Sequence, residues 1–150
     1  MKSALAFDFS KPDDPAPPRI VAARRPCVVL AEDDCEMRML VATTLRRAGW
    51  DVLEAGDGMD LLDCVAWLIE SRDDWAECVL VSDIRMPELG GLEVLERLRE
   101  LGWAGGIILI TAFGDEATHA QARELGATMV LDKPFDLDAL CEAIRKVQQS

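Results

Sequence analysis

Short apolar runs alternate with amphipathic helical patterns along most of this chain, from Pro26 onward. The apolar runs lie at 27–31, 51–55, 78–83, 107–110 and 128–132. A short, uninterrupted apolar run bounded by turn residues is typical of a strand buried on both faces of a parallel sheet. Strands that alternate with helices favour such a sheet, with helices packed on both of its faces. The sequence therefore predicts one α/β domain over residues 26–148.

Apolar residues recur at helical spacing after each run. The predicted helical faces are Met37–Leu45, Leu61–Ile69, Leu92–Leu101, a polar and alanine-rich segment at Asp115–Leu125, and Leu137–Val147. Gly49 follows the first face, as a C-terminal glycine should. Asp57-Gly58 predicts a turn, and Pro87 with Gly90-Gly91 predicts a break before the third helix.

Residues 1–25 differ in composition from the rest. The stretch 11–18 is rich in proline and charge, so it is unsuited to a helix or a central strand. We expect a flexible N-terminal extension. No apolar run approaches the length of a membrane span or a signal sequence. The five cysteines are scattered and form no C-x-x-C pair, so reduced thiols in a cytoplasmic protein are expected.

The negative net charge of the chain argues against some classes of binding partner. The chain has 28 acidic and 16 basic residues, which gives a formal net charge of −12. Direct nucleic-acid binding requires a basic surface, so it is not expected, and neither is binding to an anionic membrane. The single histidine, His119, cannot form a catalytic triad or a histidine-based zinc site alone, and its polar context predicts exposure.

Polar residues terminate four of the five apolar runs. Glu32-Asp33 follows the first run, Asp83 ends the third, Thr111 ends the fourth, and Lys133 follows the fifth. Ligands of open parallel sheets bind at the carboxyl ends of the strands, so these groups are expected to converge. Crowded carboxylates need a neutralising cation, and oxygen donors suit Mg²⁺. One carboxylate could then accept a phosphoryl group, whose oxygens a hydroxyl and an ammonium would stabilise.

Four motifs carry a family resemblance. They are Ala31-Glu32-Asp33-Asp34, Ser82 to Gly91, Ile110-Thr111-Ala112 and Asp132-Lys133-Pro134-Phe135. Each is weak alone, but the four in this order, each at a strand end, resemble the receiver domain of two-component response regulators over about residues 26–148. The resemblance implies a doubly wound, flavodoxin-like fold in three layers, with a five-stranded parallel sheet in the order 2-1-3-4-5.

The resemblance also implies roles for individual residues. Asp83 matches the phosphoacceptor, while Thr111 and Lys133 match the hydroxyl and the lysine that contact the phosphoryl group. Glu32 and Asp33 match the acidic pair that binds Mg²⁺ together with Asp83 and the main-chain carbonyl of Arg85. Asp34 is the tempting wrong choice for that pair. The family's lysine–proline bond, here Lys133-Pro134, is typically cis.

One position departs from the family pattern. Three residues before the lysine, receivers usually carry an aromatic side chain that moves inward on activation, whereas this chain has Val130. Valine is small and stiff about χ1, so it offers no ring to move. The usual threonine–aromatic coupling is therefore in doubt, and a shift would have to run through Thr111 and the backbone.

As a receiver, the chain would take a phosphoryl group from a sensor histidine kinase or a phosphotransfer protein. It would hydrolyse the acyl phosphate slowly and would not be a turnover enzyme. No output domain follows Ser150, so signalling is expected through protein contacts on the face formed by 115–125, 128–132 and 137–147. A homodimer and an output domain removed from the C-terminus both remain open.

Other interpretations remain. A receiver-like interaction module that does not use phosphate is one, and the Val130 departure favours it. A phosphohydrolase with an aspartyl nucleophile is another, although Arg85 stands where such enzymes often carry a second aspartate. Each motif also has an ordinary structural explanation: Glu32 and Asp33 could cap a helix, Asp83 a turn, and Lys133 could pair with Asp132.

Overall fold

The computed structural model describes residues 25–85, 91–112 and 116–149. Its five strands are β1 (Cys27–Ala31), β2 (Asp51–Ala55), β3 (Val79–Asp83), β4 (Gly106–Thr111) and β5 (Met129–Asp132). Its helices are α1 (Cys35–Arg47), α2 (Gly58–Ser71), the short 3-10 helix η3 (Trp75–Glu77), α3 (Gly91–Leu101), α4 (Glu116–Glu124) and α5 (Leu137–Gln149). The predicted N-terminal extension lies almost wholly outside the described residues, and so do Pro87 and Gly90.

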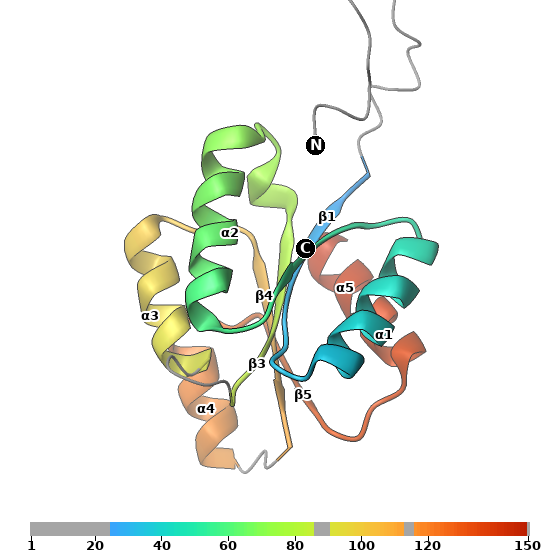
Figure 1. Cartoon of the computed structure of the whole chain (residues 1–150). Coiled ribbons are helices and arrows are strands. Elements are labelled where there is room, and N and C mark those ends of the chain that lie inside the picture. The colour runs from blue at the N-terminus through green and yellow to red at the C-terminus, as the bar shows by residue number, and fades with distance from the viewer. Residues whose placement is uncertain (1–24, 86–90, 113–115, 150) are drawn as a thin grey trace, which may run out of the picture.

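The strands form one parallel sheet in the order β2-β1-β3-β4-β5, which confirms the predicted topology. Helices α1 and α5 cover one face, and α2, α3 and α4 lie on the other (Figure 1). Because helices bury both faces of the sheet, the side chains of its central strands are almost entirely apolar. The backbone groups of these strands form their hydrogen bonds within the sheet.

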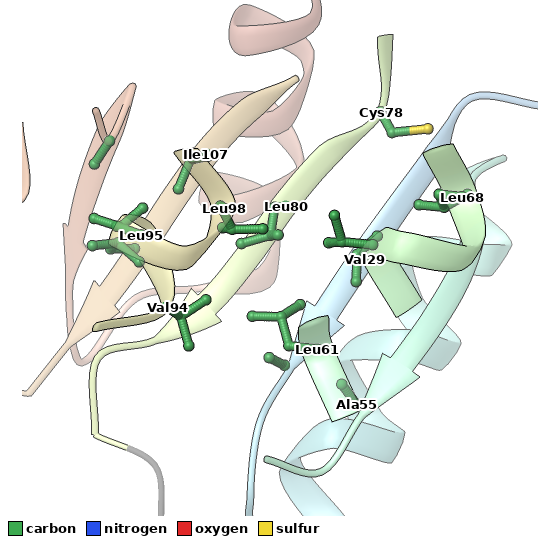
Figure 2. Close-up of a cluster of buried hydrophobic side chains, with 14 of the residues drawn as sticks. Val29, Ala55, Leu61, Leu68, Cys78, Leu80, Val94, Leu95, Leu98 and Ile107 are labelled. Carbon is green, nitrogen blue, oxygen red and sulfur yellow. The ribbon is translucent and has the colours of Figure 1, made fainter. Parts of the chain in front are cut away.

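Two apolar cores fill the space between the layers. Alternate residues of β3 face opposite ways, so Leu80 joins the core beneath α2 and α3 while Val81 joins the core beneath α1 and α5. Figure 2 shows the first core, where Leu61 and Leu98 from two helices approach Val29 and Leu80 on neighbouring strands. Because each face of β3 is buried against its own core, the register of the strand is fixed, and this positions Asp83 at the edge of the sheet.

Local signals explain where α1 begins and ends. The Asp34 carboxylate accepts hydrogen bonds from the amides of Glu36 (3.0 Å) and Met37 (3.1 Å), so Asp34 is the N-cap. The helix ends at Arg47, and Gly49 follows with a φ of 108°, as the sequence predicted.

Two details differ from expectation. Asp57-Gly58 was predicted as a turn, but Asp57 caps α2 by accepting a hydrogen bond from Asp60, and Gly58 is the first helical residue. His119 was predicted to be exposed, but its side chain is only 20% exposed. Its Nε2 lies 2.9 Å from the Asp132 carboxylate, so the side chain joins α4 to β5. No described helix is long and apolar enough to span a bilayer.

Candidate phosphoryl-acceptor site

Asp83 ends β3 at the carboxyl edge of the sheet and is 8% exposed. Its two carboxylate oxygens have different partners. Oδ1 accepts a hydrogen bond from the backbone N–H of Arg85 at 2.8 Å, and Oδ2 accepts one from the Lys133 ammonium at 2.6 Å. The carboxylate is therefore held from two sides in one orientation, which suits a group that must present an oxygen to a reactant.

Lys133 reaches this edge from the residue after β5. Its ammonium is 2.6 Å from Asp83 and 3.6 Å from Glu32 Oε1, so one cation bridges carboxylates that follow two different strands. Burial lowers the pKa of Lys133, but the hydrogen bond to Asp83 and the charges of Asp83 and Glu32 outweigh it and raise the pKa above 10.5. The Lys133–Pro134 peptide bond is cis.

Glu32 follows β1 and is 7% exposed. Its pKa lies above the ordinary 4.5, first because burial disfavours the charged form, and further because of the hydrogen bond with Asp33 and the charge of Asp83. Lys133 opposes this rise without cancelling it. The carboxyl groups of Glu32 and Asp83 thus share the ammonium of Lys133, an arrangement that a further cation would stabilise.

Asp33 and Asp34 have different surroundings, although both are exposed acidic residues after β1. The Asp34 side chain is engaged at the N-cap of α1, whereas Asp33 acts on Glu32 and helps to raise the pKa of that carboxyl group. Arg38 supports this turn by donating from Nη1 to the main-chain carbonyl of Glu32 at 2.7 Å. In the sequence, Arg38 marked the position from which the acidic pair Glu32-Asp33 was counted, but this contact of its side chain was not predicted.

Thr111 ends β4 and is 3% exposed. Its main-chain carbonyl accepts a hydrogen bond from the Lys133 N–H at 2.8 Å, and it is in register with Asp132. Thr111 and Lys133 are thus fixed at the same edge as Asp83, which pairs in register with Ile110 one residue earlier on β4. The structure brings together the four strand ends that the sequence singled out.

The donor set is one of oxygens, from Glu32, Asp33, Asp83 and the exposed main chain at Arg85, and this chemistry fits a hard divalent cation. Within the described parts of the chain, no three acidic, histidine or cysteine side chains are arranged as a preformed metal site. The Lys133 ammonium lies between Asp83 and Glu32 instead. The two carboxyl groups that share the ammonium of Lys133 are the observation that favours a fit.

An apolar pocket of about 480 Å³ opens beside Asp83. Asp83, Glu32 and Lys133 contribute its polar wall, and the remaining lining is mostly apolar: Leu30, Ala31, Met37, Leu40, Val41, Ile110, Pro134, Phe135 and Leu137. Met37 and Leu40, on the outer side of α1, are 41% and 54% exposed. The approach to the acceptor is therefore lined by apolar side chains of α1 and of the segment that leads into α5.

Comparison with known proteins places these features in context. A sequence profile described as the response regulator receiver domain matches residues 28–145. The sporulation initiation phosphotransferase F of Bacillus subtilis is 27% identical over 119 residues, which cover 79% of this chain and 90% of that protein. The C4-dicarboxylate transport transcriptional regulatory protein DctD of Pseudomonas aeruginosa is 37% identical over 121 residues, which cover 79% of this chain.

The chain spans 24% of the length of DctD, so the match there concerns one part of a longer protein. Among solved structures, the Vibrio cholerae chemotaxis protein CheY4 superimposes with a TM-score of 0.72 at 27% identity. That alignment covers 83% of this chain and 99% of CheY4. The match to the receiver-domain profile, over residues 28–145, includes Glu32, Asp33, Asp83, Thr111 and Lys133.

Proposed function

The chain belongs to the response regulator receiver domain family, and on that premise we propose that Asp83 accepts a phosphoryl group. The observation that carries the proposal is the pair of contacts on its carboxylate: the Arg85 N–H at 2.8 Å and the Lys133 ammonium at 2.6 Å. They orient the nucleophile and place a cation beside the position where phosphoryl charge would develop.

In the transfer step, an oxygen of the Asp83 carboxylate forms a bond to phosphorus as the bond from phosphorus to the donor's histidine nitrogen breaks. The electron pair of that bond stays on the imidazole, which takes up a proton as it leaves. The ammonium of Lys133 stabilises the transferred oxygens, and the hydroxyl of Thr111 is the second group proposed to contact them. Slow hydrolysis of the acyl phosphate by water returns the domain to its starting state, without turnover of a separate substrate.

Glu32, Asp33, Asp83 and the main-chain carbonyl of Arg85 would hold Mg²⁺. The bound ion supplies charge neutralisation for the transferring phosphoryl group. Glu32 and Asp83 share the ammonium of Lys133, so Lys133 alone leaves the site with excess negative charge. For this reason a trianionic cluster of carboxylates would repel a phosphoryl donor unless a further cation reduced its charge.

The donor we propose is a histidine kinase or a phosphotransfer protein that covers the apolar pocket beside Asp83. A phosphohistidine on a protein surface must come within bonding distance of a buried carboxylate, so its carrier has to contact the rim. That rim presents Met37 and Leu40, which are 41% and 54% exposed. Apolar side chains at this exposure suit a protein surface that binds reversibly. The surface of α4, β5 and α5 is then left for a downstream protein.

The decisive experiment uses a small donor. Acetyl phosphate with Mg²⁺ should add one phosphoryl group to the wild-type chain, seen in the intact mass, and chelation of the metal should prevent it. Asp83→Asn should remain unmodified, whereas the matched variant Asp132→Asn, one residue from the site lysine, should still be labelled. Equal labelling of Asp83→Asn would assign the acceptor to another residue. No labelling of the wild type would favour an interaction module that does not use phosphate.

A further inference from the structure

A histidine on α4 contacts the strand end that leads into the site. Nε2 of His119 lies 2.9 Å from Oδ1 of Asp132, the last residue of β5. The His119 side chain is 20% exposed and that of Asp132 is 53% exposed. The pair therefore lies at the surface but is partly shielded from water, and it connects two elements that are separate in the chain.

Helix α4 buries little of its surface against the rest of the described fold. Of its nine residues, all described, Ala122 alone is buried. The side chain of Arg99 on α3 reaches the main-chain carbonyl of Glu124 at the far end of the helix, at 3.2 Å. Figure 1 shows α4 at the lower edge of its layer, beside β5. With so little apolar burial, the position of α4 on the sheet depends strongly on polar contacts such as the one to Asp132.

Asp132 is also coupled to the phosphoryl-acceptor edge. It is in register with Thr111 on β4, and the next residue, Lys133, donates its N–H to the Thr111 carbonyl at 2.8 Å. The ammonium of the same Lys133 contacts Asp83 at 2.6 Å. The side chains of these two consecutive residues thus contact different elements: Lys133 contacts Asp83, and Asp132 contacts His119 on α4.

We propose that His119 is the residue through which α4 responds to the state of Asp83, with Asp132 as its intermediary. The inference rests on the proposed phosphorylation of Asp83 and adds the route by which that event leaves the site. His119 acts here as a positioning residue, because it touches none of the reacting atoms.

The physical reason is a change of charge at one end of a short connected chain. Phosphorylation replaces a carboxylate with a group that carries about two negative charges and three acceptor oxygens. The Lys133 ammonium, now bound to Asp83 and Glu32, then has stronger partners and moves toward them. Asp132 follows through the peptide bond, so the contact with His119 changes and α4 shifts between two packings. Val130, which has no ring, cannot supply the usual aromatic contact, and the His119–Asp132 pair is a polar link between β5 and α4.

The chain itself provides the probe, because His119 is its only histidine. Side-chain nitrogen spectra of ¹⁵N-labelled protein will therefore contain one imidazole. Beryllofluoride with Mg²⁺, a phosphoryl mimic, should shift that imidazole in the wild type and leave it unchanged in Asp83→Asn. Backbone amides of 116–124 should shift in parallel.

Variants then separate coupling from loading of the site. In His119→Gln and Asp132→Asn, beryllofluoride should still shift the amides around Asp83 and Lys133, while the shifts of α4 amides should fall by about half or more. Arg123→Gln, a substitution of another α4 side chain that is exposed, is the matched control and should respond as the wild type does. The circular dichroism spectrum of each variant should match that of the wild type, as expected if the helices remain folded.

Three results would overturn the inference. If the amides around Asp83 respond but the imidazole does not, or if both pair variants keep the full response in α4, then His119 carries no coupling although the proposed function stands. If no resonance anywhere in the wild type responds to beryllofluoride, the proposed function fails and the inference fails with it.

Discussion

Glu32 shows how a single residue can be arranged for a ligand at the expense of stability. Its carboxyl group is buried beside Asp33 and Asp83, and the result is a pKa above 4.5. A carboxyl group whose pKa is higher in the folded chain than in the unfolded chain favours folding only in its protonated form. Stability is therefore lost as the pH rises above 4.5 and through the raised pKa.

We therefore predict that Glu32→Gln will raise the free energy of unfolding at neutral pH, because the amide needs no charge compensation. The gain should shrink as the pH falls below 4.5, where Glu32 is protonated in both states. Urea unfolding between pH 4 and 8, about the range where carboxyl shifts act, measures this. A variant that is less stable than the wild type at neutral pH would show that Lys133 outweighs burial.

Added Mg²⁺ should reverse the order of stability. A ligand that binds only the folded state at ten times its Kd stabilises by about 1.4 kcal/mol. The wild type should gain this stabilisation, and Glu32→Gln should gain much less because it lacks one carboxylate donor. Both series need the same ionic strength, so that screening does not imitate binding.

At the scale of elements, Asp34 caps helix α1, whereas the neighbouring Asp33 belongs to the proposed metal site. Asp34 accepts hydrogen bonds from two amides that have no partner inside the helix, and Asp33 faces Glu32. Two adjacent, exposed aspartates are thus assigned to different tasks by the direction in which the chain turns after β1.

We predict that Asp34→Ala will lower the free energy of unfolding by about 1 kcal/mol through loss of the cap, and that it will keep the stabilisation by Mg²⁺. Asp33→Ala should do the opposite: little change without metal, and a reduced response to it. Thermal unfolding of the two variants with and without Mg²⁺ tests both assignments. If Asp34→Ala is the variant that loses its Mg²⁺ response, the two roles have to be exchanged.

The elements were predictable from sequence because their signals are local. Apolar runs, helical spacing and Gly49 gave the order and approximate bounds of the five strands and five α-helices, since each follows from neighbours within a few residues, whereas the short 3-10 helix η3 was not predicted. Gly58 was misplaced because a turn and a helix N-terminus use the same Asp-Gly pair. The contact of His119 with Asp132 was not predictable, because it joins residues that only the completed sheet brings together. For the same reason, the sequence indicated that Lys133 would reach the site but not that it would bridge Asp83 and Glu32.

At the scale of the whole molecule, the two faces of the sheet carry different surfaces. The α1 and α5 side contains the pocket beside Asp83 and the exposed side chains of Met37 and Leu40. The opposite side contains α2, whose Met59 is 52% exposed but lies in the other layer. A protein donor has to approach the first side, whereas a small donor needs only the opening at the site.

We predict that Leu40→Asp will reduce phosphoryl transfer from a protein phosphohistidine at least tenfold, about the effect of losing one well-packed contact and adding a repulsive charge. Labelling by acetyl phosphate should be unchanged. Met59→Asp, which adds the same charge at a methionine of similar exposure, is the control and should affect neither reaction. Equal loss in both variants would mean that net charge, and not the α1 surface, governs the encounter.

The alternation of β3 between two cores has a consequence for insertions and deletions. Because Leu80 and Val81 face opposite layers, each residue from Val79 to Asp83 is tied to one side by its count along the strand. Substitutions within the strand can be absorbed by repacking, but adding or removing one residue would exchange the sides of all that follow. Asp83 would then turn away from Lys133. The number of residues in the strand is therefore fixed by the two cores, and we expect length variation between relatives to be confined to the loops.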